Sequence, residues 1–141
     1  MVLRKLSTID EYLQQIREFS GVSIDEYKSD WKSQRIVERT LQMLIETCAD
    51  IANHIISDRN MRIPASYSDT FRVLLENNVI DENLFAVMEK MAKFRNIVVY
   101  QYEEVDAEIV IIILRKHLDD FVRFRDAILG SLKAMPSGAN S

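Results

Sequence analysis

The scarcity of helix-breaking residues is the feature that most limits what this chain can fold into. Only 3 Gly and 2 Pro occur among 141 residues, so most of the chain can run as uninterrupted helix. The prolines, Pro64 and Pro136, both fall where other signals already indicate a break. The balance of 48% hydrophobic and 28% charged residues is typical of a globular domain with one core. We therefore predict an all-α protein with a single domain over residues 1–134 and a flexible tail over 135–141.

Apolar residues recur every three or four positions in several long segments, which is the pattern of amphipathic helices. The first segment runs from Val2 to Gly21. Three others begin after aspartates that can cap a helix, Asp30, Asp81 and Asp106. A shorter helix follows the capping candidates Ser66 and Ser68 and closes at 77–78, while the short acidic and aromatic stretch over 25–31 is assigned no helix. The pattern predicts an antiparallel up-and-down bundle of four major helices with a shorter helical insertion.

Two β-branched runs, Ile97–Val99 and Ile109–Ile113, leave a strand as the competing interpretation. Capping residues and helical periodicity flank both runs, and burial in a tertiary structure often overrides intrinsic propensity. We therefore expect both runs to be helical.

Charge and composition exclude several functional classes. The net charge of −4 argues against a protein that coats nucleic acids, although a local basic site stays compatible with it. Cys48 is the only cysteine, so no internal disulfide can form. Residues 1–6 lack the apolar core of a signal peptide, and the longest apolar run, Ile109–Leu114, is far shorter than a membrane span. We expect a cytoplasmic protein without a membrane contact.

The segment 94–102 has polar residues at its two ends and apolar residues between them. On a continuous helix Arg95 and Tyr102 share one face, because seven residues make almost two turns, and Asn96 and Tyr100 share another. A guanidinium, an amide and two phenols along one strip can bind and orient a phosphate. The chemistry alone equally allows an arginine paired with an acid of a neighbouring helix and two tyrosines at the edge of the core.

The order Phe94-Arg95-Asn96, a β-branched run and Tyr-x-Tyr resembles the HEPN signature Arg-Asn-x-x-x-His-x-Tyr. Further matches lie in 34–39, 44–46, 50–55, 63–67 and at Phe71. Their order and spacing resemble the HepT toxins of bacterial toxin–antitoxin pairs over nearly the whole chain.

The resemblance implies a HEPN fold and a homodimer in which the motif helices of two subunits form one composite site. It also implies a metal-independent endoribonuclease that acts on RNA and needs no cofactor. Carried over to this sequence, Arg95 stabilises charge on the phosphate, Asn96 orients the site, and position 100 holds the acid or base.

Position 100 departs from the family pattern, because Tyr100 stands where the signature has His. A phenol, with an ordinary pKa of about 10, can donate a proton but is a poor base at neutral pH, whereas imidazole can do either. We therefore expect cleavage by this chain to be weakened or absent. Three explanations of Tyr100 stay open. The chain is a degenerate family member, it uses altered chemistry, or the substitution permits production of an otherwise toxic protein.

The final tyrosine of the signature corresponds to Tyr102. In HepT-type pairs this residue is adenylylated by a minimal nucleotidyltransferase that serves as antitoxin, so the resemblance implies that partner and that modification. The phosphate of the adenylyl group would then add charge and bulk beside Arg95 and block the binding of RNA. The alternative for Tyr102 is a phenol packed at the edge of the helix.

Two acids on the second long helix, Glu46 and Asp50, are four residues apart and share a face, so either could hold Arg95 in place. The alternative is that both are ordinary solvated acids. His54 and His117 lie in unrelated helices, and we predict no metal site and no catalytic role for either.

Two further functions compete with the toxin ribonuclease. The first is a non-catalytic HEPN binding module that pairs with a nucleotidyltransferase or binds nucleotide, and the second is a structural helical protein without a site. Restoring His at position 100 discriminates the binding module from the ribonuclease.

Overall fold

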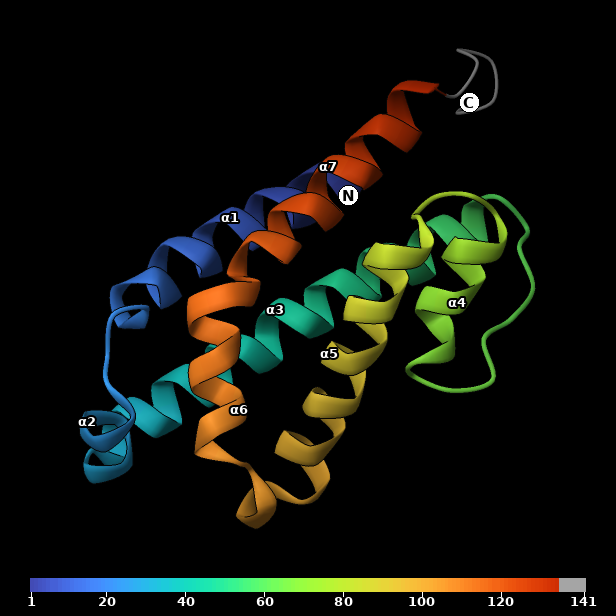
Figure 1. Ribbon diagram of the computed structural model, residues 1–141. Helices are drawn as coiled ribbons and strands as arrows, with labels where there is room; N and C mark the ends of the chain where they lie inside the picture. The colour runs from blue at the N-terminus through green and yellow to red at the C-terminus, as the bar shows by residue number, and fades with distance from the viewer. Residues whose placement is uncertain (135–141) are drawn as a thin grey trace.

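The computed structural model describes residues 1–134, which are helical almost throughout (Figure 1). No strand occurs in this part of the chain, so the all-α prediction is confirmed and both β-branched runs are helical. The predicted tail over 135–141 lies outside the described residues. The elements are α1 (Val2–Ile16), η1 (Arg17–Phe19), α2 (Ile24–Ser29), α3 (Trp31–Asp58), α4 (Asp69–Glu76), α5 (Glu82–Tyr100), η2 (Tyr102–Glu104), α6 (Ala107–Ile112), η3 (Ile113–His117) and α7 (Leu118–Ala134).

The long helices alternate in direction, as predicted for an up-and-down bundle. Figure 1 shows α3 crossing the centre of the molecule, with α1 running antiparallel to it and α7 running beside α1. Helix α5 descends along α3, η2 turns the chain, and α6 leads back up into α7. Helix α4 is the shorter insertion and packs against α3 and α5.

The predicted aspartate caps are confirmed. The carboxylates of Asp30, Asp81 and Asp106 accept hydrogen bonds from backbone N–H groups in the first turns of α3, α5 and α6 at 3.1, 2.8 and 2.8 Å. At α4 the prediction is only half right. Ser68 occupies the cap position without a side-chain hydrogen bond, while the hydroxyl of Ser66 accepts from the first residue of the helix at 3.1 Å. These bonds satisfy backbone donors that have no partner within the helix.

Two local features differ from the predicted pattern. Residues 24–29 form the short helix α2, capped by Ser23, where no helix was predicted. The final helix is interrupted by η3, a π-helical turn over Ile113–His117. A π turn accommodates an extra residue. It keeps Ile113 and Leu114 buried while the residues that follow, Arg115 and Lys116, are exposed.

One hydrophobic core joins all the long helices. Phe71 of α4 and Phe124 of α7 meet edge to face, with ring centroids 5.9 Å apart. Cys48 lies fully buried inside this core. Among residues 1–134, no helix is long and apolar enough to cross a membrane.

Candidate active site

Arg95 of α5 is held by an acid of α3. Its Nε and one terminal nitrogen both lie 2.9 Å from Oε2 of Glu46, and Gln42 donates to the same oxygen at 3.0 Å. The Arg95 and Glu46 side chains are only 16% and 25% exposed, so the pair is shielded from bulk water. Charge-assisted bonds of this kind orient a guanidinium as well as stabilise it. Of the two acids singled out from the sequence, Glu46 is therefore the one that contacts Arg95.

Two aromatic rings flank the Arg95 guanidinium. Its central carbon lies 4.2 Å from the ring centroid of Tyr67 and 5.9 Å from that of Tyr100. Both distances fall within the range of cation–π attraction. Burial is the largest single influence and opposes the charge on Arg95, but the hydrogen bond to Glu46 and the electrostatic influence of Tyr67 and Glu46 together raise the pKa of Arg95 overall. The guanidinium therefore remains charged and keeps a fixed orientation.

Tyr67 lies in the loop between α3 and α4, and its hydroxyl is buried without a hydrogen-bond partner. Burial raises the pKa of Tyr67 above its ordinary value, and the nearby charge of Arg95 opposes that shift only partly. The phenol thus stays neutral and serves Arg95 through its ring.

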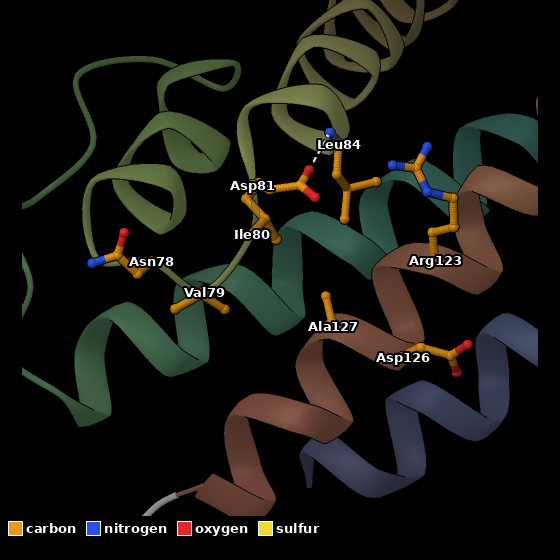
Figure 2. Close-up of a pocket in the computed structure, with 8 residues that line it drawn as sticks. All are labelled: Asn78, Val79, Ile80, Asp81, Leu84, Arg123, Asp126 and Ala127. Carbon is orange, nitrogen blue, oxygen red and sulfur yellow. Dashed lines mark hydrogen bonds between the residues drawn. The ribbon is translucent and has the colours of Figure 1, made fainter.

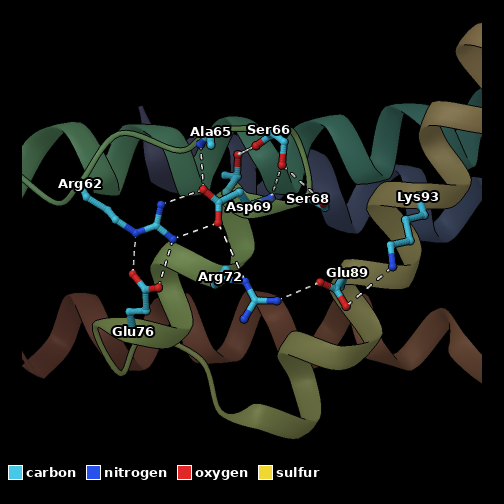
Figure 3. A network of polar contacts seen from close by, with 10 residues as sticks. Arg62, Ala65, Ser66, Ser68, Asp69, Arg72, Glu76, Glu89 and Lys93 are labelled. Atoms are coloured by element: carbon cyan, nitrogen blue, oxygen red, sulfur yellow. Dashed lines mark hydrogen bonds and ion pairs between the residues drawn. The ribbon is translucent and has the colours of Figure 1, made fainter.

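An ion-pair network fixes the loop that carries Tyr67 (Figure 3). Arg62, near the start of the loop, donates to Asp69 and Glu76 at 2.7 Å each, and Asp69 also accepts from the backbone N–H of residue 65 at 2.8 Å. These hydrogen bonds hold the pKa values of the Asp69 and Glu76 carboxyls below their ordinary range. Arg72 extends the network to Glu89 of α5 at 3.3 Å. The loop is therefore tied to the same helix that bears Arg95.

Asn96 and Tyr100, which the sequence places beside Arg95, both lie on α5. The amide oxygen of Asn96 accepts a hydrogen bond from Arg95 at 3.1 Å. Tyr100 is the last residue of the helix and is 73% exposed. Arg95, Asn96 and Tyr100 thus form one group at the C-terminal end of α5.

The expectation that Tyr102 shares a helical face with Arg95 is wrong. Helix α5 ends at Tyr100, and Gln101, with φ −138° and ψ 44°, turns the chain into η2, where Tyr102 lies 65% exposed. The residues after Tyr102 are Glu103 and Glu104, and acids are unfavourable at the negative end of a helix dipole. The chain must also turn here so that the next helix can begin after its aspartate cap.

The remaining candidates lie apart from the Arg95 group. Asp50, with its side chain 59% exposed, pairs with Lys5 of α1 at 3.4 Å. His54 pairs with Asp58 at 3.3 Å, and His117 with Asp120 at 2.8 Å. In residues 1–134 there is no cluster of three or more His, Cys, Asp or Glu side chains that could hold a metal ion.

Sequence reasoning missed Tyr67 and Gln42 as parts of the site. Tyr67 is separated from Arg95 by a loop and two helices, so no periodicity joins them. It entered the sequence argument only as one match to the HepT pattern. Gln42 lies four residues before Glu46 on α3, a spacing that puts both on one face and that could have been noticed.

A separate hollow of about 480 Å³ lies where the turn before α5 meets α7 (Figure 2). Its walls include Asp81, whose carboxylate caps α5, and Arg123, which donates to Asp120 and Asn83 at 2.9 Å each. Both side chains are therefore already engaged with neighbouring residues. The hollow is therefore a surface feature of the packing between α5 and α7.

The fold is that of a HEPN domain, because this up-and-down helical bundle superposes on a solved HEPN toxin at 35% identity. The chain belongs to the ribonuclease HepT-like family, whose sequence model matches residues 9–128. It is similar to the mRNA nuclease HepT of Shewanella oneidensis, with 36% identity over 128 residues that cover 91% of this chain and 96% of the relative.

Two further comparisons agree with this assignment. The tRNA nuclease HepT of Aphanizomenon flos-aquae is 29% identical over 104 residues, covering 72% of this chain and 69% of the relative. The solved structure of a tri-AMPylated Shewanella oneidensis HEPN toxin in complex with its MNT antitoxin superposes with a TM-score of 0.84 at 35% identity, covering 92% of this chain and 96% of that one.

Proposed function

We propose that residues 1–134 act as a single HEPN domain and that the chain is the toxin of a toxin–antitoxin pair. In this proposal two copies form a homodimer with a composite site that cleaves RNA without a metal ion. The observation that carries the proposal is the Arg95 guanidinium, fixed by Glu46 and lying 5.9 Å from the ring of residue 100. A phosphate held by Arg95 would lie within reach of a proton-transfer group at position 100.

The residues of the Arg95 group divide the chemistry of phosphodiester cleavage between them. Arg95 stabilises the negative charge that develops on the phosphate, as a fixed cation in a partly shielded site does most effectively. Asn96 accepts from Arg95 at 3.1 Å and thereby keeps the terminal nitrogens aligned. The side chain at position 100 donates a proton to the leaving oxygen or removes one from the attacking hydroxyl.

Tyr100 weakens this chemistry in the present chain. A phenol can supply the proton to the leaving oxygen but is a poor base at neutral pH. Because a well-placed acid or base contributes about 10²- to 10⁴-fold to a rate, we expect a loss of that order relative to a histidine.

The test is RNA cleavage and growth arrest on expression of three proteins: the unaltered chain, Tyr100→His, and Tyr100→His combined with Arg95→Ala. We expect Tyr100→His to cleave RNA at least about 100-fold faster than the unaltered chain, and Arg95→Ala to abolish the gain. Cleavage by the unaltered chain at the same rate would contradict the role given to position 100. No cleavage by any of the three would contradict the ribonuclease proposal.

We propose further that a minimal nucleotidyltransferase partners this chain and adenylylates Tyr102. The phenol is 65% exposed in η2, next to the end of α5, so an enzyme can reach it. The phenol oxygen would attack the α-phosphorus of ATP, pyrophosphate would leave, and the phenolic proton would pass to solvent. The added phosphate would bring negative charge close to the Arg95 group and repel the phosphates of RNA.

Mass spectrometry after incubation with a cognate nucleotidyltransferase and ATP tests this modification. We expect adenylyl adducts on the unaltered chain and none at position 102 in Tyr102→Phe. Tyr100→Phe is the matched control, because Tyr100 is the neighbouring exposed tyrosine at 73% exposure. Adducts on Tyr100 with Tyr102 unmodified would contradict the proposed site.

The second candidate function is a binding module without cleavage activity, and Tyr100 is the observation that favours it. Such a module would keep the surface that pairs with the nucleotidyltransferase. A Tyr100→His protein that binds the nucleotidyltransferase but leaves RNA intact would support this alternative.

A further inference from the structure

Basic and aromatic side chains gather on one face of the N-terminal half of α3. Trp31 opens the helix, Arg35 and Arg39 follow it at intervals of four residues, and Lys32 lies three residues before Arg35. Residues with these spacings share a helical face. All four side chains are exposed, and Trp31 is 64% exposed. We call these four residues the α3 basic face.

The charge of the α3 basic face is only partly balanced by neighbouring acids. Between residues 31 and 45, three bases against one acid, Glu38, leave a net charge of +2 in a chain whose overall charge is −4. Glu38 is half-buried and lies near Tyr27 of α2, where it adds to the burial that raises the pKa of Tyr27. Burial also raises the pKa of Glu38 itself, and the nearby Arg35 opposes this shift only partly. Within residues 1–134 the three bases form no ion pair, so they can bind an anion.

The same face of α3 leads to the Arg95 group. Gln42 follows Arg39 by three residues and donates to Glu46, which holds Arg95. With a rise of 1.5 Å per residue, Glu46 lies about 10.5 Å along the helix axis from Arg39 and about 21 Å from Lys32. Figure 1 shows the N-terminal end of α3 extending away from α5 towards α2. The α3 basic face and the Arg95 guanidinium therefore lie along one side of α3.

This combination of side chains fits single-stranded RNA. Proteins bind a single strand by placing cations along its phosphates and exposed aromatic rings against its unpaired bases. Double-stranded RNA keeps its bases stacked inside the helix, so it could use the cations but not the ring. Lys32 lies 5.8 Å from the centre of the Trp31 ring, which places a cation directly beside the stacking surface.

We propose that the α3 basic face binds the segment of single-stranded RNA next to the phosphate that Arg95 holds. Its three cations contact phosphates of this segment, and one base stacks on the ring of Trp31. The choice of RNA rests on the proposed function, whereas the surface rests on the residues of α3. A strand stacked as in a duplex advances about 3.4 Å per nucleotide, so about six nucleotides span the distance from Lys32 to Glu46. The chain therefore selects RNA that is unpaired beside the bond to be cleaved.

The fluorescence of Trp31 tests the stacking directly, because Trp31 is the only tryptophan of the chain. Titration of the unaltered chain with an unlabelled oligoadenylate of about 12 nucleotides should quench this fluorescence until the protein is saturated. A double-stranded RNA of the same length should leave it unchanged. No quenching by the single strand, or equal quenching by the duplex, would overturn the proposal.

The salt dependence of the same titration tests the cations. For a single strand, the slope of the logarithm of the binding constant against the logarithm of the salt concentration is about −0.7 for each phosphate neutralised. We expect Arg35→Gln and Arg39→Gln each to flatten the slope by about 0.7 and to raise the dissociation constant about 10-fold.

Arg4→Gln is the matched control for these two variants. Arg4 is an exposed arginine of α1, and the next residue, Lys5, pairs with Asp50 in the C-terminal half of α3. This variant should leave the slope and the dissociation constant unchanged, and circular dichroism confirms that each variant is folded. Equal effects of Arg4→Gln and Arg39→Gln would overturn the assignment of the α3 basic face.

Replacement of the ring gives an independent test with a fluorescein-labelled oligoadenylate. Trp31→Ala should raise the dissociation constant about 5- to 100-fold, because a stacked base loses its partner. Trp31→Phe keeps an aromatic face and should recover most of the affinity. A Trp31→Phe protein as weak as Trp31→Ala would overturn the stacking on Trp31.

The outcomes separate this inference from the proposed function. In the Tyr100→His background, Arg39→Gln should raise KM and leave kcat nearly unchanged, because it removes binding that the ground state and transition state share. RNA binding as predicted, without cleavage by Tyr100→His, contradicts the ribonuclease alone. Cleavage with an unchanged KM contradicts the α3 basic face alone. Loss of nucleotidyltransferase binding but not of RNA binding in Arg35→Gln/Arg39→Gln would assign the face to that partner and overturn the proposal.

Discussion

The ring of Tyr67 lies against the guanidinium of Arg95, with 4.2 Å between the ring centroid and the guanidinium carbon. The two residues come from a loop and a helix that share no sequence pattern. Their contact covers one face of the guanidinium, while Glu46 fixes its edge through two nitrogens at 2.9 Å. Arg95 is therefore restrained in both the plane and the tilt of its guanidinium before any phosphate binds.

Truncating Glu46 should destabilise the fold, because it leaves a guanidinium that is 16% exposed without its counter-charge. We expect Glu46→Ala to lower the free energy of unfolding by about 1–3 kcal/mol. Asp50→Ala is the matched control, since Asp50 pairs with Lys5 on the surface, and it should change stability by less than about 0.5 kcal/mol. Urea unfolding measures both, and equal effects would contradict the shielding of the Arg95–Glu46 pair.

The contact between Tyr67 and Arg95 should appear as an energetic coupling. In a double-mutant cycle of Tyr67→Leu with Arg95→Met, we expect a coupling of about 0.5–2 kcal/mol in the free energy of unfolding. Tyr67→Phe keeps the ring and removes only a hydroxyl that has no partner, so it should preserve the coupling. If the cycle of Tyr67→Phe with Arg95→Met gave a coupling energy as large as the cycle with Tyr67→Leu, the hydroxyl rather than the ring would carry the interaction.

Acid should destabilise the protein through the carboxyls that bind Arg62. Their pKa values in the folded state lie below the ordinary values of 3.8 for Asp69 and 4.5 for Glu76. Their contribution is thus fully present above about pH 5 and is lost as the pH falls below 4.5 towards the folded-state values. The urea midpoint of the unaltered chain, measured from pH 6 to pH 3, should fall over that window.

Removing Arg62 should flatten this pH dependence. We expect Arg62→Gln to start from a lower urea midpoint at pH 6 and to lose less of it on acidification. Arg17→Gln is the control, because Arg17 also pairs with an aspartate, Asp119, whose side chain is 84% exposed. A pH profile of Arg62→Gln parallel to that of the unaltered chain would contradict the network as its source.

Cys48 should be unreactive in the folded protein. Its thiol is fully buried, and burial raises the pKa of Cys48, so little thiolate is available and no reagent can reach it. We expect no labelling by a thiol reagent in buffer over the time in which the chain unfolded in urea is labelled completely. Rapid labelling in buffer would show that the core opens around α3.

The sequence by itself determined the long helices and their aspartate caps. The signals for these helices are local, and each acts on the backbone within one or two turns. They are the scarcity of Gly and Pro, the apolar stripes with helical spacing, and the aspartates at 30, 81 and 106. Glu46 could be proposed as a partner of Arg95 for the same reason, because helical periodicity puts it on a face that points into the bundle.

Only the tertiary structure decided which distant residues meet. It brings Tyr67 over Arg95, directs Asp50 to Lys5 instead of the site, and ends α5 before Tyr102. The π turn over 113–117 also follows from packing. These features depend on how helices separated by many residues fit together, and loop paths and side-chain packing across helices leave no period in the sequence.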